Sequence, residues 1–162
     1  DSGSNYSAAI TIDSFDTEAL FANTLYQALD FSGASDSTFK LSFDIDVTTE
    51  FDSQDPFAFA DYFLIGLHDG SGNYYDANGD IGALVDGNIE SDFSQSFSFD
   101  LDNSFTNSTG WFLEFQLLSS FDFSASTLIV DDVSLTEVPE PSTLAIFALG
   151  LLGLVTRKKY LK

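Results

Sequence analysis

Oxygen-bearing side chains alternate in one loop of this sequence, at Asp76, Asn78 and Asp80. Carboxylate and amide oxygens are the ligands that calcium prefers, and this spacing matches the first, third and fifth positions of a calcium-binding loop. The match then ends, because Ile81 stands where the sharp turn needs glycine and Gly87 stands where the bidentate glutamate belongs. The pattern excludes an EF-hand. It leaves two interpretations open, a non-helical calcium loop and a solvated hairpin turn.

Two carboxylates, Asp61 and Glu114, interrupt apolar stretches. Asp61 shares its alternation with Phe63 and Ile65, so we expect its carboxylate to point inward. Paired carboxylates catalyse glycoside hydrolysis, but the sequence identifies no partner for Asp61. The sequence has no nucleophile elbow and no phosphate-binding loop, and its single histidine and lack of cysteine exclude two-imidazole sites and thiol chemistry. We therefore predict a protein that is not an enzyme.

Aromatic side chains offer a different chemistry, because sugar rings stack on exposed aromatic faces. The best candidates are the adjacent Tyr74 and Tyr75, which lie in a stretch rich in glycine and aspartate, and Tyr62 and Trp111 are further ones. Tyr74 and Tyr75 thus predict a carbohydrate-binding site. The alternative is that one of the two rings packs against a sheet.

Charge divides the chain into two unequal parts. Residues 1–140 hold all 26 acidic residues and a single lysine, a net charge of −25, whereas residues 141–162 carry +4. Such acidity excludes nucleic acid as the natural partner, since phosphate neutralisation needs lysine and arginine. Because the chain begins at Asp1 rather than methionine, we expect that a signal peptide has been removed, with a truncated chain as the alternative.

The sequence pattern predicts that the elements that position these side chains are β-strands. Apolar and polar residues alternate over residues 39–47, 93–101 and 111–117, as in strands with one buried face. Residues 57–67 are apolar at both alternations, which predicts a central strand covered on both faces. Further strands are expected at 8–12, 25–31 and 127–135, although residues 17–29 could form a short helix instead.

Short strands separated by turns rich in Asp, Ser, Gly and Asn are typical of an all-β, antiparallel β-sandwich of jelly-roll type. We predict this fold for residues 1–137, followed by one C-terminal hydrophobic helix in a separate segment, 138–162. The expected core includes Phe43, Phe97, Phe99, Phe115 and Val133.

The C-terminal segment has three parts. A helix-excluding joint, Pro139-Glu140-Pro141, comes first, because proline restricts its predecessor and lacks a donor. Residues 144–155 are then apolar or glycine without interruption, and Arg157-Lys158-Lys159 follows. This run is shorter than the roughly 20 residues of a comfortable membrane span, but flanking residues can extend it. Basic residues after the run place that end in the cytoplasm, so the acidic body would lie across the membrane.

This order of parts resembles the PEP-CTERM sorting signal of bacterial exosortase substrates. The resemblance covers residues 138–162 and implies recognition by an exosortase, with processing near Pro139-Glu140-Pro141. It implies an exported protein that is transiently anchored in the inner membrane and reaches the cell surface or extracellular matrix, often in association with exopolysaccharide. An ordinary tail anchor or a buried helix is the alternative.

A second resemblance lies in residues 128–135, which are similar to the last strand of galactose-binding-like jelly rolls, including carbohydrate-binding modules. In that group the strand often supplies an aspartate to a structural calcium, which implies this role for Asp131. By alternation Asp131 shares a face with Ile129, Val133 and Leu135, on the inward side. A bulge or a rim position would expose it instead.

Three functions follow from these observations. The first is a non-catalytic surface or matrix protein with a structural or adhesive role, sorted by its tail. The second is a carbohydrate-binding module that attaches to exopolysaccharide through exposed aromatic rings. The third is a subunit of an extracellular homopolymer or filament, in which a retained tail helix packs between subunits.

Overall fold

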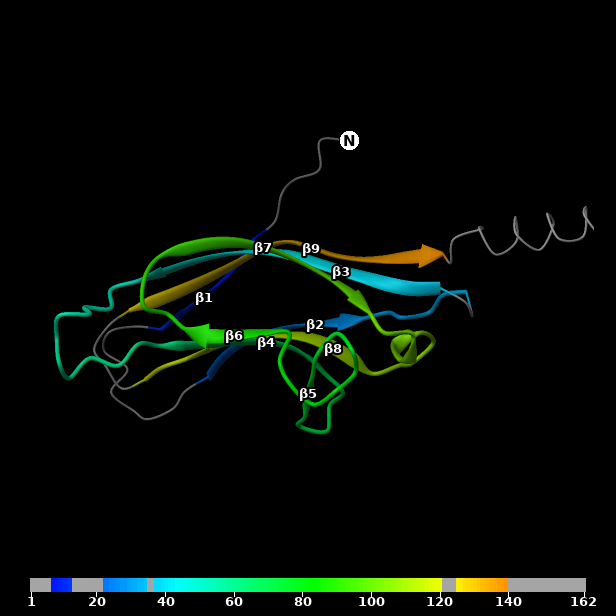
Figure 1. Cartoon of the computed structure of the whole chain (residues 1–162), viewed down its shortest axis with the longest axis horizontal. Helices are drawn as coiled ribbons and strands as arrows, with labels where there is room; N and C mark the ends of the chain where they lie inside the picture. The colour runs from blue at the N-terminus through cyan, green and yellow to red at the C-terminus, as the bar shows by residue number, and fades with distance from the viewer. Residues whose placement is uncertain (1–6, 13–21, 35–36, 121–124, 140–162) are drawn as a thin grey trace, which may run out of the picture.

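Two layers of antiparallel strands make up the body of the protein (Figure 1). The structure is a computed structural model that describes residues 7–12, 22–34, 37–120 and 125–139. One layer is a four-stranded sheet in the order β1-β9-β3-β7, and the other is a five-stranded sheet in the order β2-β8-β4-β5, with β6 also paired to β4. All-β content and two antiparallel sheets confirm the predicted β-sandwich.

The four-stranded sheet is built from β1 (Ala8–Ile12), β9 (Ser126–Pro139), β3 (Ser37–Thr49) and β7 (Phe93–Leu101). The five-stranded sheet is built from β2 (Ala22–Leu29), β8 (Trp111–Leu118), β4 (Tyr62–His68), β5 (Tyr74–Tyr75) and β6 (Val85–Asn88). A short 3-10 helix, η1 (Asn103–Phe105), connects β7 to β8. The helix proposed as an alternative for residues 17–29 is wrong where the structure describes it, because residues 22–29 form β2.

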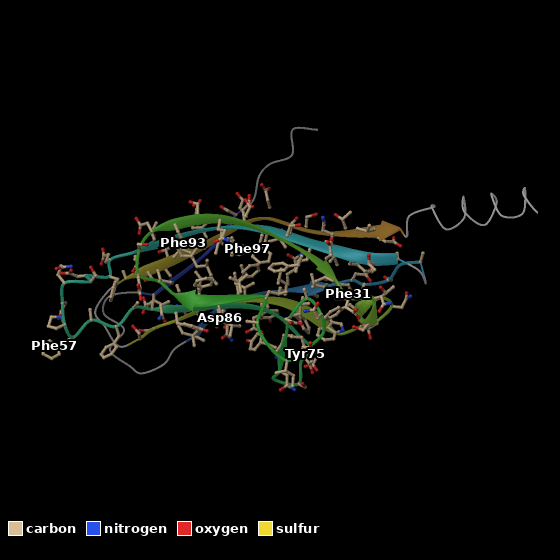
Figure 2. The ribbon with its side chains drawn as sticks, viewed as in Figure 1. Phe31, Phe57, Tyr75, Asp86, Phe93 and Phe97 are labelled. Atoms are coloured by element: carbon tan, nitrogen blue, oxygen red, sulfur yellow. The ribbon has the colours of Figure 1, made fainter. Side chains whose placement is uncertain are left out.

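Phenylalanine rings fill the space between the sheets. Phe43 is 1% exposed, and its ring centroid lies 5.4 Å from that of Phe97 and 5.3 Å from that of Phe115. Figure 2 shows Phe31, Phe93 and Phe97 between the two layers. The predicted core is confirmed for Phe43 and Phe115, which are buried, whereas Phe97, Phe99 and Val133 are half-buried and pack against it. Phe97 and Phe99 lie on β7, an edge strand of its sheet.

The strand predicted over residues 57–67 begins only at Tyr62. Residues 51–61 form a loop in which Phe57 is 83% and Phe59 is 67% exposed, and Figure 2 shows Phe57 at its outer tip. The side chain of Asp55 accepts a hydrogen bond from the backbone N–H of Phe57 (2.9 Å), which forms a turn next to Pro56. The expectation that both faces of residues 57–61 are covered is therefore wrong.

A bulge in β9 changes which side chains face the core. The register with β3 shifts between Ser42 and Asp44, and Asp132 takes a positive φ of 50°. Before the bulge Leu128 and Val130 are buried, so the core-facing alternation is opposite to the one predicted. Asp131 is half-buried beside the bulge, and Ile129 is half-buried as well, so the predicted inward face at these two positions is wrong. The sequence offered the bulge as the alternative, and the structure shows it.

The last strand continues past the predicted domain boundary at residue 137. Val138 pairs with Thr38 and Pro139 pairs with Ser37, so both belong to the sandwich. The predicted C-terminal helix, residues 144–155, and the basic cluster lie outside the described residues. Within the described part of the chain, no helix is long and apolar enough to cross a membrane.

Candidate functional site

The outer face of the five-stranded sheet, turned away from the core, gathers aromatic and polar side chains from β2, β4, β5, β6 and β8. Strand pairing sets Tyr26 beside Glu114, His68 beside both Phe112 and Tyr74, and Gln116 beside both Thr24 and Leu64. The other alternation of β4 and β8 is buried, at Phe63, Ile65, Leu67, Leu113, Phe115 and Leu117. The core therefore fixes the positions of the side chains on the outer face.

Two aromatic rings define one end of this face. Tyr26 is 66% exposed, and its ring meets that of Phe112 edge to face, with centroids 5.9 Å apart. Beside them lies a hollow of about 290 Å³ lined by Thr24, Tyr26, His68, Gly70, Phe112 and Glu114. An exposed ring next to polar side chains is an arrangement suited to a ligand with both apolar and hydroxyl-bearing faces.

A hydrogen-bonded group of polar side chains adjoins the hollow. The hydroxyl of Tyr74 donates to Oε1 of Glu114 (2.7 Å), and Nε2 of Gln116 donates to the Tyr74 oxygen (2.6 Å) and to Oε1 of Glu114 (2.8 Å). Nδ1 of His68 lies 4.0 Å from Oε2 of Glu114 and accepts a hydrogen bond from the N–H of Gly70 (3.1 Å). When the ring is neutral, its proton is then on Nε2, which can donate to a ligand.

Gly66 lets Tyr74 lie across β4. A Cβ atom at residue 66 would stand 2.8 Å from Cδ1 of Tyr74, closer than real contacts allow. Burial of the Tyr74 phenol, together with its hydrogen bond to Glu114, raises the pKa of Tyr74. The hydrogen bond from Tyr62 to Asp86 likewise raises the pKa of Tyr62. Both phenols therefore stay protonated to a higher pH than an ordinary tyrosine, and their hydroxyls hydrogen-bond these carboxylates.

Removing the Tyr74 hydroxyl tests this group of side chains. We expect Tyr74→Phe to lower the free energy of unfolding at pH 8 by about 1 kcal/mol, because Glu114 and Gln116 lose a partner. The raised pKa of Tyr74 stabilises the fold below the unfolded-state value near 10, and this contribution is lost as pH rises above it. Denaturant titrations should show that the difference in unfolding free energy between Tyr74→Phe and the wild type becomes smaller above pH 10. Tyr26→Phe, which removes an exposed hydroxyl, is the control, and an unchanged difference would contradict the prediction.

The structure separates the aromatic candidates that the sequence grouped. Tyr74 pairs with His68 on the outer face, whereas Tyr75 pairs with Leu67 on the opposite alternation. The ring centroids of Tyr75 and Trp111 lie 5.1 Å apart, and the hydroxyl of Tyr75 donates to Oδ2 of Asp69 (3.0 Å). All three of Tyr74, Tyr75 and Trp111 are half-buried. Tyr62 and Tyr74 belong to the outer face, and a carbohydrate-binding role for Tyr75 stays a prediction without further support.

Sequence reasoning missed Tyr26 and Phe112. A signal was available for Phe112, because it is an apolar residue on the polar alternation of residues 111–117. Tyr26 lay in a segment that fitted a helix as well as a strand.

The loop with the calcium-like spacing is closed by its own hydrogen bonds. Oδ1 of Asp76 accepts from the backbone N–H of Asn78 (2.8 Å) and of Asp80 (3.0 Å). Burial acts to raise the pKa of Asp76, but these hydrogen bonds outweigh it and the pKa is lowered. Within the described residues, no three His, Cys, Asp or Glu side chains are grouped so as to hold a metal ion. The geometry of this loop fits the hairpin-turn interpretation. Asp131, the other predicted calcium ligand, lies on β9 in the four-stranded sheet and not in this loop.

Calcium binding stays a prediction from the sequence for Asp76, Asn78 and Asp80 and for Asp131. A bound cation would relieve repulsion within the acidic body and stabilise it by mass action. The expected result is a melting temperature that rises with millimolar calcium and falls with chelator, while sodium at matched ionic strength has no such effect. Equal melting temperatures in calcium and chelator would remove the specific site.

The prediction that Asp61 points inward is confirmed, since this residue is 1% exposed. Its Oδ1 accepts a hydrogen bond from the backbone N–H of Ser120 (3.0 Å), and its carbonyl accepts from the N–H of Ile89 (2.7 Å). Asp61 therefore ties the loop before β4 to the residues after β8 and β6.

Comparisons with known proteins identify the C-terminal segment. Residues 137–159 match the family model described as the PEP-CTERM protein-sorting motif, which confirms the resemblance found in the sequence. The match implies export through the exosortase pathway, with transient anchoring in the membrane. The motif residues from Glu140 onward, including Pro141, Arg157, Lys158 and Lys159, lie outside the described residues.

The body is weakly similar to two solved structures. No curated protein matches the sequence. A solved structure described as "CBM4 structure and function" is 16% identical, with a TM-score of 0.38 over 82% of this chain and 84% of that chain. A second, described as "Structure of infectious bursal disease virus Gx strain", is 9% identical, with a TM-score of 0.21 over 86% of this chain and 42% of that chain. Both scores are low, and we infer nothing about function from either.

Proposed function

We propose that this chain is an exported, non-catalytic surface or matrix protein that exosortase sorts through the C-terminal motif and whose body adheres to exopolysaccharide. The observation that supports adhesion is the outer face of the five-stranded sheet, where the exposed Tyr26 and the half-buried Phe112 lie beside a hydrogen-bonded group, Glu114, Tyr74 and Gln116. This proposal joins the structural or adhesive role to the carbohydrate-binding role predicted from the sequence.

The side chains on this face suit the two kinds of surface that a pyranose ring presents. The C–H face of a sugar stacks on an aromatic ring, and Tyr26 offers such a ring to solvent. Sugar hydroxyls both donate and accept, so they can bond with Glu114, with the amide of Gln116 and with Nε2 of His68. Because these groups already hold one another in place, little ordering is needed when a sugar binds.

Charge favours a neutral polymer over an acidic one. Residues 1–140 carry a net charge of −25, and Lys40 is the only lysine or arginine among them. Lys40 lies on β3 in the four-stranded sheet, where its Nζ is 3.5 Å from Oδ1 of Asp100. An anionic polysaccharide would therefore be repelled at long range, more strongly at low salt. An uncharged exopolysaccharide meets no such penalty.

Co-sedimentation of the full-length chain with exopolysaccharide from its source tests the proposal. A polyoxyethylene detergent keeps the apolar tail in solution without adding a sugar headgroup that competes. We expect Tyr26→Ala to weaken binding roughly tenfold, which corresponds to about 1.4 kcal/mol for one lost stacking contact. Phe57→Ala, which removes a more exposed ring outside the hollow, is the matched control. Equal binding by wild type and Tyr26→Ala would contradict adhesion through this face.

Processing of the tail decides between sorting and the homopolymer alternative. If exosortase processes the chain, protein released from its native source should end near Pro139, Glu140 or Pro141 and lack the four basic residues of 141–162. If the chain polymerises through a retained tail helix, assembled protein should still contain Lys162. Intact mass spectrometry distinguishes these outcomes, and a released protein that retains Lys162 would contradict processing.

A further inference from the structure

A second hollow lies at the other end of the same outer face. Its volume is about 630 Å³, and Tyr62, Asn88 and Leu118 line it. These three residues form one rung of the sheet, since Tyr62 pairs with both of the others. Phe59 and Ser120 also line this hollow, from the segments that flank the sheet.

The two hollows lie along one strand of the sheet, β4. His68 lines the first and Tyr62 lines the second, and both lie on β4 with side chains on the same alternation. Six residue-to-residue steps along the strand join Tyr62 to His68, which is about 20 Å at 3.3 Å per step. Between them on the outer face lie Leu64, its neighbours Gln116 and Asp86 on β8 and β6, and the ring of Tyr74, which crosses β4 at Gly66.

Phe59, one of three aromatic residues that line the second hollow, is held in place. The hydroxyl of Ser120 donates to the carbonyl oxygen of Phe59, and the backbone N–H of Ser120 donates to Oδ1 of the buried Asp61 (3.0 Å). The Phe59 ring is nevertheless 67% exposed. Burying this apolar surface would be favourable, and it stands beside the hydroxyl and amide groups of Tyr62, Asn88 and Ser120. The second hollow thus repeats the chemistry of the first, an exposed ring beside polar groups.

We propose that the two hollows are the ends of one binding strip, which takes a linear, uncharged polysaccharide along its length. This inference rests on the proposed adhesion to exopolysaccharide and specifies the ligand class of that face. A single sugar or a disaccharide occupies only the hollow at Tyr26 and Phe112. A longer fragment also reaches Phe59, and a single continuous chain then gains from both contacts.

An uncharged glycan fits this strip better than a peptide. Among described residues the strip has carboxylates at Glu114, Asp86 and Glu90 but neither lysine nor arginine, so it would select a basic peptide if it bound one. Strand addition does not apply to the middle of a sheet, where the main chain of β4 and β8 is already paired on both sides. Side chains alone contact the ligand here, as stacking and hydroxyl recognition require.

Affinity as a function of ligand length tests the strip. The probes are neutral oligosaccharides made by partial hydrolysis of the source exopolysaccharide and separated by size, with isothermal calorimetry on the full-length chain. For the wild type we expect affinity to rise with length until a fragment spans about 20 Å and then to level off. For Phe59→Ala we expect unchanged affinity for the shortest fragments and roughly tenfold weaker binding of the long ones.

Matched variants make the result specific to the second hollow. Phe57→Ala removes the ring two residues away that does not line the hollow, and it should bind as the wild type does. Asn88→Ala, at the same hollow, should repeat the effect of Phe59→Ala in direction. Thermal melts should show that each variant is folded, because the substituted positions are exposed.

Failure of this inference differs from failure of the proposed function. Absence of binding to the whole exopolysaccharide would overturn adhesion and the strip together. Binding that is independent of fragment length, or equal long-fragment affinities for Phe59→Ala and Phe57→Ala, would overturn the strip alone. Binding of a basic peptide but of no oligosaccharide would assign the face to a protein partner and contradict the inference.

Discussion

Replacing Leu149 and Leu152 with aspartate should abolish display of the protein at the cell surface. Both residues lie in the uninterrupted apolar run of residues 144–155, which the sorting motif includes. A charge near the middle of a membrane costs about 3 kcal/mol, so two of them remove the favourable insertion of a run this short. The body should still fold. Surface labelling and cell fractionation measure the loss.

The control places the same charges elsewhere. Ser53→Asp/Ser91→Asp adds two carboxylates to exposed positions of the body, so it changes net charge equally without touching the apolar run. This variant should be displayed as the wild type is. Normal display of Leu149→Asp/Leu152→Asp would show that something other than the tail retains the protein, and the sorting proposal would be wrong.

Replacing Phe43 with alanine should lower the free energy of unfolding by about 3–5 kcal/mol, as is typical of a phenylalanine removed from a core. Phe43 is 1% exposed, and its ring contacts those of Phe97, Phe99 and Phe115 from both sheets. The remaining stability is small, because domains are only marginally stable and the acidic body repels itself. We expect the variant to be partly unfolded at 37 °C in low salt.

Phe57→Ala is the matched comparison for stability as well, since it also removes a phenylalanine ring, but one that is 83% exposed. Its unfolding free energy should stay within about 0.5 kcal/mol of the wild type, as for most surface substitutions. Denaturant titrations of both variants measure the difference. Similar values for Phe43→Ala and Phe57→Ala would mean that the rings between the sheets do not form the core.

The parts of the fold that the sequence predicted well are those with a strict alternation of period two. Residues 39–47 alternate without a break and residues 93–101 alternate except at Gln95, and they form the paired strands β3 and β7. The run at 57–67 has apolar residues on both alternations, so its pattern could not separate a buried strand from an exposed loop. The Asp55-Pro56 turn before Phe57 was the signal that favoured the loop.

The bulge in β9 shows why position on a face was harder to predict. One extra residue at Asp132 and Val133, opposite Phe43, shifts the register against β3, and a pattern of alternation cannot reveal such a shift before the partner strand is known. The candidate site depended on pairing in the same way. Tyr26 is distant in sequence from Phe112 and Glu114, and only the pairing of β2 with β8 brings it beside them.

The central claim is that the outer face of the five-stranded sheet binds exopolysaccharide, and an NMR titration tests it most directly. Full-length protein in a polyoxyethylene detergent is titrated with a neutral exopolysaccharide fragment, and amide and side-chain shifts are followed. The proposal predicts that changes concentrate at Tyr26, His68, Phe112, Glu114 and Gln116. Changes confined to the four-stranded sheet, around Lys40 and Asp100, or the absence of any change at saturating fragment, would contradict it.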